Sequence, residues 1–579
     1  MNQPAPSIET VFENLSETNH KFIADLMSTL AVNQQWNSTE MFGTLIAGLA
    51  KNSDRWIAIQ KQYQHHHMEL WSAMVQGGPA APPAALVEAD VVDRRFKAPE
   101  WQQLPYFSYL KQAYLLKSRW MAELVEAADI DERSRHKLRF FTGQIMDAAA
   151  PSNFAATNPE ALKLASTSDG TSLAHGLENL CADVKKHRIT MTDEAAFEVA
   201  RNIAITPGAV VFENELMQLI QYAPATDTVY QRPLLMVPPF INKFYVLDLQ
   251  PDNSLARYAV AQGHTVFMVS WRNVSADMGH MTWDDYVSSG VIKAIDVARK
   301  ICAVRQINTL GFCVGGTLLA CALAVLRGQR HSDAASVTLL ASMLDFSDTG
   351  DLSLFVDEAF VKQREQEFAH GGVMLGRQLA LTFSFLRAND LVWYYVVNNY
   401  LKGRKPNAFD LLHWNSDSTN LPGTMFAYYI RNMYLENNLR IPGKLTMCGV
   451  SVDLSKINAP AYVLASREDH IVPWKTAFQS TQLLDGKTEF VLAASGHVAG
   501  VINPASSNKR HYSTNPDLPV DADAWLAGAH QHTGSWWDHW SRWLAKRGGK
   551  RVAARKQPGN AQYRSIEPAP GRYVKQACD

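Results

Sequence analysis

A pentapeptide with a cysteine at its centre is the part of the chain whose residue types could do chemistry. It reads Gly-Phe-Cys-Val-Gly over Gly311–Gly315, and it lies between a short apolar run from Ile307 and a Leu- and Ala-rich helix former. A strand, a tight turn and a helix would expose the Cys313 sulfur at the tip of the turn. The helix N-terminus would favour a thiolate there, and the Val314 N–H would face a developing oxyanion.

The pentapeptide alone is equally compatible with a cysteine that is simply part of an apolar core. A cysteine nucleophile needs a general base, and the base needs a group that orients it. Asp469 directly follows an expected strand at 461–466, and His497 follows another at 489–492. Nucleophile, acid and histidine in this order, each past a strand end, is the arrangement of α/β-hydrolases. We therefore predict a catalytic triad of Cys313, Asp469 and His497.

Two neighbouring residues compete for these roles. Glu468 could replace the acid, but Arg467 beside it offers a surface partner. His470 could replace the base, but adjacent side chains diverge, so it is poorly placed to bond Asp469.

The second oxyanion donor is expected in the turn after an early buried strand, which is its place in this fold. That strand begins at Pro233, and the turn continues through Pro238 and Pro239 to Phe240. Proline has no N–H, so Phe240 is the predicted donor beside Val314.

The elements that must position these groups alternate between strand and helix from Thr206 onward. We expect a hairpin at 210–222, further strands at 265–271, 307–312 and 336–341, and helices at 254–261 and 286–301. This alternation predicts right-handed βαβ units and an α/β fold with a mostly parallel, hydrolase-like sheet.

Three other regions complete the predicted organisation. Residues 1–205 read as a helical N-terminal domain, with Val11, Leu15, Phe22, Leu26 and Leu30 at helical spacing, a linker at 77–85 and a loop at 158–170. The catalytic domain spans 206–545, and an aromatic-rich helical insertion at about 345–444 is predicted to form a cap, closed at rest. A helix at 525–544 ends this domain, and the tail 546–579 is expected to be extended or loosely docked.

Composition narrows the function classes. The 579 residues carry a net charge of −1, which gives no basis for nucleic-acid binding. Six cysteines without a CxxC pair favour a reducing cytoplasm over a disulfide framework or a zinc site. The N-terminus has no signal-peptide pattern, and no apolar run is long enough for a bilayer span. His65–His67 point three ways on a helix, so we expect a solvated face and no metal.

Several motifs resemble those of polyhydroxyalkanoate synthases, from about residue 90 to the C-terminus. They are the cysteine elbow and the segments Asn242–Leu249, Gln262–Phe267, Thr282–Tyr286, Glu468–Trp474, Ser495–Pro504 and Ile566–Val574. A full-length chain with its own N-terminal domain looks like the class I branch. Phe240 departs from the pattern, because a smaller residue is expected at that turn.

The resemblance implies that (R)-3-hydroxyacyl-CoA, chiefly 3-hydroxybutyryl-CoA, is polymerised to polyester with release of CoA. Cys313 would carry the acyl group and His497 would take the thiol proton, while Asp469 would orient His497 or itself activate the hydroxyl. No cofactor is implied, because acyl-CoA is the substrate. Family members work as homodimers on cytoplasmic polymer granules. Two alternatives remain: a thioesterase that uses water as acceptor, and a non-enzymatic granule-coating protein.

Overall fold

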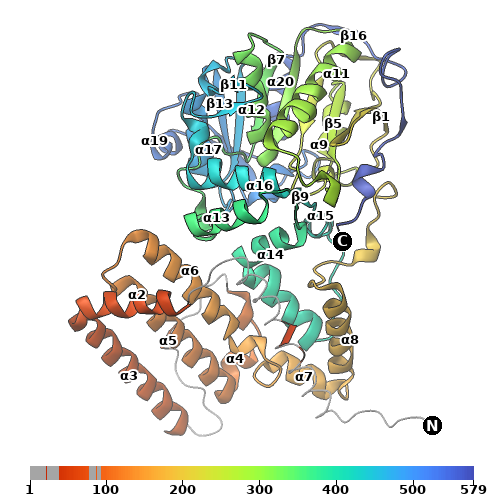
Figure 1. The fold of residues 1–579 in the computed structure, drawn as a ribbon. Coiled ribbons are helices and arrows are strands. Elements are labelled where there is room, and N and C mark those ends of the chain that lie inside the picture. The colour runs from red at the N-terminus through yellow and green to blue at the C-terminus, as the bar shows by residue number, and fades with distance from the viewer. Residues whose placement is uncertain (1–17, 19–20, 23–37, 77–85, 88–92, 579) are drawn as a thin grey trace. The chain divides into compact units, whose positions relative to one another are not determined.

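The computed structural model describes residues 18, 21–22, 38–76, 86–87 and 93–578. They form two compact units, each drawn in Figure 1. The first unit joins the chain up to Asp193 with Leu381–Asn407, and the second joins Glu194–Ala380 with Ala408–Asp579. This division differs from the expected domains, because the middle of the predicted insertion belongs with the N-terminal helices.

The first unit is helical, as predicted. Its helices are α2 (Ser38–Lys51), α3 (Ser53–Gln76), α4 (Glu100–Gln103), α5 (Pro105–Ala127), α6 (Glu132–Ala148), α7 (Pro159–Thr167), α8 (Thr171–Lys186), η8 (Asn389–Trp393) and η9 (Val396–Leu401). The predicted loop at 158–170 is wrong, because α7 fills most of it. The Asn158 side chain caps α7 by accepting a hydrogen bond from the Ala161 N–H, and Pro159 suits the first helical position.

Two aromatic groups form cores in this unit. Phe96, Trp101 and Tyr114 are buried together, while Trp393 and Tyr400 of the inserted segment belong to a second buried cluster. His65–His67 lie exposed or half-buried on α3, as expected. The predicted linker at 77–85 and Val11, Leu15, Leu26 and Leu30 lie outside the described residues.

The second unit is built on an 11-stranded sheet in the order β15-β14-β13-β12-β7-β6-β4-β5-β2-β1-β17. The strands are β1 (Gly208–Glu213), β2 (Met217–Tyr222), β4 (Leu234–Val237), β5 (Val266–Trp271), β6 (Ile307–Phe312), β7 (Ala334–Leu340), β12 (Ala461–Ser466), β13 (Thr488–Ala493), β14 (His511–Thr514), β15 (His530–Thr533) and β17 (Glu567–Pro568). The six from β13 to β5 are parallel, and the outer strands pair antiparallel. The predicted α/β class is confirmed.

Helices pack around this sheet (Figure 1). They include α9 (Leu255–Ala261), α10 (Trp283–Asp285), η6 (Tyr286–Ile292), α11 (Lys293–Cys302), α12 (Val314–Gly328), α13 (Glu358–Glu367), α15 (Asp410–Ser416), α16 (Gly423–Tyr429), η10 (Ile430–Leu435), α17 (Trp474–Gln479), α18 (His497–Val501), α19 (Ala522–Ala527) and α20 (Trp537–Ala545). The helix α14 (Gly376–Leu386) runs from the second unit into the first. All six residues of β6 and most of α12 are buried, which is typical of a central parallel strand and its following helix.

The C-terminal region differs from the prediction. The single helix expected at 525–544 is α19, then β15, then α20, so the sheet gains a strand there. The tail pairs with the sheet through β17, and β16 (Arg551–Ala553) pairs with β3 (Thr228–Tyr230). The tail was predicted to be extended or loosely docked: it is extended at β16 and β17, and the burial of Tyr573 and Val574 shows that it is not loosely docked. Among the described residues, no helix is both long and apolar enough to span a membrane.

Candidate active site

Cys313 lies at a strained turn in the centre of the sheet. The strand β6 ends one residue before it, α12 begins one residue after it, and its φ and ψ are 54° and −132°. A positive φ costs a residue with a Cβ about 1–3 kcal/mol, so the surrounding structure must impose it. Two backbone hydrogen bonds do so: the Cys313 N–H donates to Leu340 O at 2.9 Å, and Cys313 O accepts from the Gly316 N–H at 2.9 Å.

The glycine after the cysteine allows the elbow to close on its neighbour. A Cβ on Gly315 would collide with the carbonyl oxygens of Val237, the last residue of β4, and of Pro238, which follows it. The turn that contains Phe240 therefore begins directly against the elbow, and any larger residue at Gly315 would push it away.

Asp469 and His497 lie beyond β12 and β13, at the same edge of the sheet as Cys313. The His497 Nδ1 lies 2.7 Å from Asp469 Oδ2, and both side chains are buried. The other oxygen, Asp469 Oδ1, accepts from the N–H groups of Ile471 at 2.9 Å and Val472 at 2.8 Å. The carboxylate is thus fixed on both sides, and it faces the imidazole.

The competing residues do not share this arrangement. Glu468 is exposed, while Asp469 beside it is buried. The Asp469 carboxylate pairs with His497, 28 residues further along the chain.

Three groups surround the His497 imidazole. Burial lowers its pKa, but the Asp469 carboxylate hydrogen-bonded to it and the nearby Cys313 sulfur raise the pKa well above the ordinary value. The Phe312 ring stacks on the imidazole with centroids 5.5 Å apart. The site therefore stabilises a proton on His497, which is the form that results when the imidazole takes the proton from Cys313.

The two predicted oxyanion donors, Val314 and Phe240, lie on either side of the close approach of Gly315 to Val237 and Pro238. Val314 is the first residue of α12, so its N–H has no acceptor within the helix. Phe240 is 1% exposed, and its ring packs edge-on against Trp271, Tyr286 and Tyr429. Its side chain therefore belongs to the aromatic core beside the site, and its backbone role stays a prediction.

Two tyrosines near Cys313 were missed by the sequence analysis. Burial raises the pKa values of Tyr429 and Tyr434, and the nearby Cys313 sulfur raises both further. Their rings meet edge-to-face with centroids 5.4 Å apart. Aromatic richness of the insertion was visible in sequence, but it could not separate these residues from Trp393 and Tyr400, which pack in the first unit.

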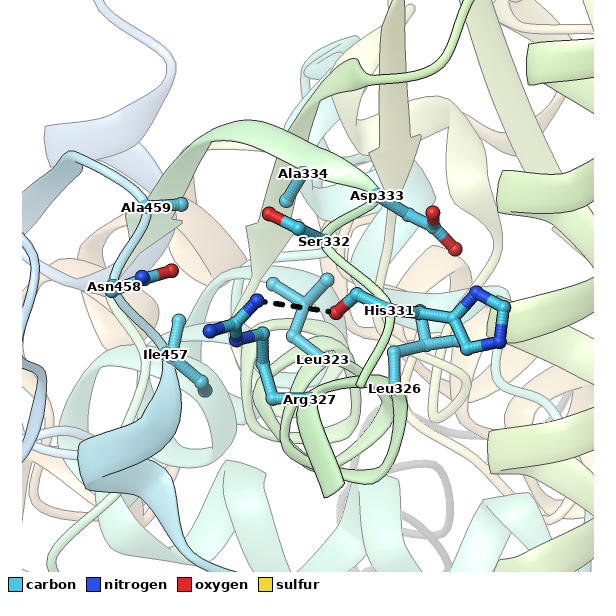
Figure 2. Close-up of a pocket in the computed structure, with 10 residues that line it drawn as sticks. All are labelled: Leu323, Leu326, Arg327, His331, Ser332, Asp333, Ala334, Ile457, Asn458 and Ala459. Carbon is cyan, nitrogen blue, oxygen red and sulfur yellow. Dashed lines mark hydrogen bonds between the residues drawn. The ribbon is translucent and has the colours of Figure 1, made fainter. Parts of the chain in front are cut away.

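A small pocket in the second unit is a different feature (Figure 2). Leu323, Leu326 and Arg327 at the far end of α12 line it, so about three helical turns separate it from Cys313. Arg327 fills part of it and donates from Nε to Lys456 O at 3.0 Å. It carries none of the chemistry described above.

Comparison with known proteins places the chain in a family. Residues 92–259 match the family described as "Poly-beta-hydroxybutyrate polymerase (PhaC) N-terminus", and residues 233–504 match the alpha/beta hydrolase fold. The chain is 52% identical to the poly(3-hydroxyalkanoate) polymerase subunit PhaC of Cupriavidus necator, over 95% of each chain. It is 40% identical to the poly(3-hydroxyalkanoate) polymerase of Methylorubrum extorquens, over 91% of this chain and 87% of that one.

A third relative, the poly(3-hydroxyalkanoate) polymerase subunit PhaC of Rhizobium meliloti, is 39% identical over 93% of this chain and 89% of its own. These similarities extend over nearly the whole chain, and they confirm the resemblance that the motifs predicted. The chain belongs to the poly(3-hydroxyalkanoate) polymerase family.

Proposed function

We propose that this protein is an acyltransferase that polymerises (R)-3-hydroxyacyl-CoA into polyester through an acyl group held on Cys313. The observation that carries the proposal is the set of contacts from Asp469 through His497 to Cys313 at the strained elbow. A cysteine suits this reaction because exchange between two thioesters is nearly isoenergetic.

In the first step His497 takes the proton of the Cys313 thiol, and the sulfur attacks the thioester carbonyl. The Val314 and Phe240 N–H groups stabilise the oxyanion until the carbon–sulfur bond to CoA breaks. The CoA thiolate leaves with the proton from His497, and Cys313 keeps the acyl group. No metal or other cofactor takes part in the proposed step.

In the second step the 3-hydroxyl of another unit, or of the growing chain, attacks the acyl group on Cys313. His497 takes the hydroxyl proton, with Asp469 orienting its ring, and the Cys313 thiol is restored. The buried Tyr429 ring near the Cys313 sulfur, against which the buried Phe240 ring packs edge-on, supports a short acyl chain, chiefly 3-hydroxybutyryl.

The test follows CoA release and product size together, with (R)-3-hydroxybutyryl-CoA as substrate. Wild-type protein should release CoA and form insoluble polyester, and Cys313→Ala should lose both by at least a thousandfold. Cys181→Ala is the matched control, because Cys181 is an exposed free cysteine in the first unit.

Other products would contradict the proposal. Free 3-hydroxybutyrate without polymer would establish a thioesterase, and no CoA release with any acyl-chain length would favour a granule-coating protein.

The proposal includes assembly as a homodimer on the surface of cytoplasmic polymer granules. Exposed apolar side chains on α2 and α3, among them Ile46, Met68 and Trp71, support association of the first unit with an apolar surface. Sedimentation with purified granules, and molar mass in solution with and without substrate, would test these two points.

A further inference from the structure

The end of the chain reaches the loop that follows the proposed oxyanion turn. The Lys243 ammonium donates to Gln576 O at 2.6 Å, and Lys243 is only 3% exposed. Burial lowers the pKa of Lys243, and the neighbouring Asp417 opposes that shift. Burying a lysine ammonium costs free energy unless it is hydrogen-bonded, and here it donates to a carbonyl of the tail.

Two more side chains hold the same tail. Asn273, after β5, donates from Nδ2 to Ala577 O at 2.8 Å, and the Cys578 thiol donates to Asn420 Oδ1 at 2.8 Å. Asn273 and Asn420 are themselves joined, because the Asn420 N–H donates to Asn273 Oδ1 at 2.9 Å. Figure 1 shows the C-terminal end of the ribbon beside α15 and β9 (Leu421–Pro422).

The loop itself is held from its other side by residues that precede β9. The Thr419 N–H donates to Ile241 O at 2.8 Å, and Trp414 Nε1 donates to Lys243 O at 2.7 Å. The segment 240–243 is thus fixed by residues 414–419 through its own carbonyls and by the tail through the Lys243 side chain.

We propose that Lys243 is a positioning residue, and that residues 576–578 form a C-terminal brace that fixes the loop carrying the Phe240 N–H. The inference rests on the proposed function, since it concerns the oxyanion of that reaction. Oxyanion stabilisation depends on a donor that is already in place, and shifts of about 1 Å weaken it strongly. Lys243 lies three residues after Phe240, so the brace acts on the turn through a short length of backbone.

The experiment compares Lys243→Met and Lys243→Arg in the full-length protein with a chain that ends at Lys575 and is otherwise unchanged. With 3-hydroxybutyryl-CoA we expect Lys243→Met and the shortened chain to lower kcat about tenfold or more, with KM within about twofold of wild type. Lys243→Arg should recover part of kcat, because a guanidinium can also donate to Gln576 O. Lys575→Met is the matched control, since Lys575 is exposed, and its kcat should equal that of wild type.

Alkylation of Cys313 by iodoacetamide separates positioning from general damage, because this reaction forms no oxyanion. Its rate should be unchanged in Lys243→Met and in the shortened chain. A wild-type kcat in both Lys243→Met and the shortened chain would overturn the brace. A joint fall of the alkylation rate, kcat and Tm in these variants would also overturn it, because it would show general damage to the fold. If wild type itself releases no CoA, the proposed function fails and the brace fails with it. Wild-type turnover with unaffected variants contradicts the brace alone.

Discussion

At the scale of single residues, the Asp469 carboxylate helps to raise the pKa of His497. Burial alone would lower the pKa of His497. The Asp469 carboxylate at 2.7 Å and the Cys313 sulfur both raise this pKa, and together they outweigh burial. Because the folded pKa is above the unfolded value of about 6.5, protonated His497 stabilises the folded state. That contribution is fully present below about pH 6.5 and is lost as the pH rises through the folded pKa.

Asp469→Asn should therefore lower the pKa of His497 and destabilise the protein in a pH-dependent way. We expect a loss of about 2 kcal/mol near pH 6, and a smaller loss as the pH rises above the folded pKa. Thermal unfolding across this range, with NMR titration of the imidazole, would measure both effects. Glu468→Gln is the control, because Glu468 is exposed. A pH-independent difference between wild type and Asp469→Asn would contradict this account.

At the scale of elements, the elbow depends on how closely α12 approaches the end of β4. A Cβ at Gly315 would meet two backbone carbonyls, and backbone cannot rotate away as a flexible side chain can. The same contact sets the distance between the two proposed oxyanion donors, Val314 and Phe240.

Gly315→Ala should destabilise the protein by about 1–3 kcal/mol through overpacking, and it should lower kcat. Gly143→Ala is a contrasting control on the exposed face of α6, where an added Cβ would meet nothing within 4 Å. It should stabilise the protein by about 0.5–1 kcal/mol, because alanine is the better helix former. Thermal unfolding and CoA release would distinguish the two; equal Tm values for the two variants would refute the steric argument.

At the scale of the whole molecule, the chain leaves the second unit at Leu381 and returns after Asn407. The segment between is anchored within the first unit by two polar contacts, of which the first is buried and the second partly exposed. The Tyr400 hydroxyl donates to Asp183 Oδ2 at 2.7 Å, and the Lys402 ammonium lies 2.6 Å from Glu160 Oε2. A truncation that removes the N-terminal helices would expose this segment.

Tyr400→Phe should weaken the anchoring of the segment by about 1–2 kcal/mol, because it removes one hydrogen bond from the buried Asp183 carboxylate. Limited proteolysis should then cut within 381–407 faster than in wild type. Tyr394→Phe changes the same chemical group on the same segment, but Tyr394 is 52% exposed and its variant should resist cleavage like wild type. Equal cleavage rates for Tyr400→Phe and wild type would show that the contact does not hold the segment.

The sequence by itself determined the fold class and the strands that place the site. Buried parallel strands are continuous apolar runs, and the strands at 307–312, 461–466 and 489–492 are such runs. Cys313, Asp469 and His497, respectively, follow shortly after the ends of these strands. Because the carboxyl ends of parallel strands lie at one edge of a sheet, the positions of Cys313, Asp469 and His497 after their strands were enough to predict that they lie close together.

The tertiary structure alone decided which distant segments complete the site. Tyr429 and Tyr434 lie near Cys313 although more than a hundred residues of chain separate them from it. The brace at 576–578 contacts Lys243 from the C-terminal end of the chain. No periodicity in the local sequence predicts such long-range contacts. The strand β15 was also hidden, since all four of its residues are exposed and it pairs at an edge, where the apolar pattern is absent. The spacing of apolar residues along the sequence indicates which face of a helix or strand is buried, but long-range packing decides which residues cover that face.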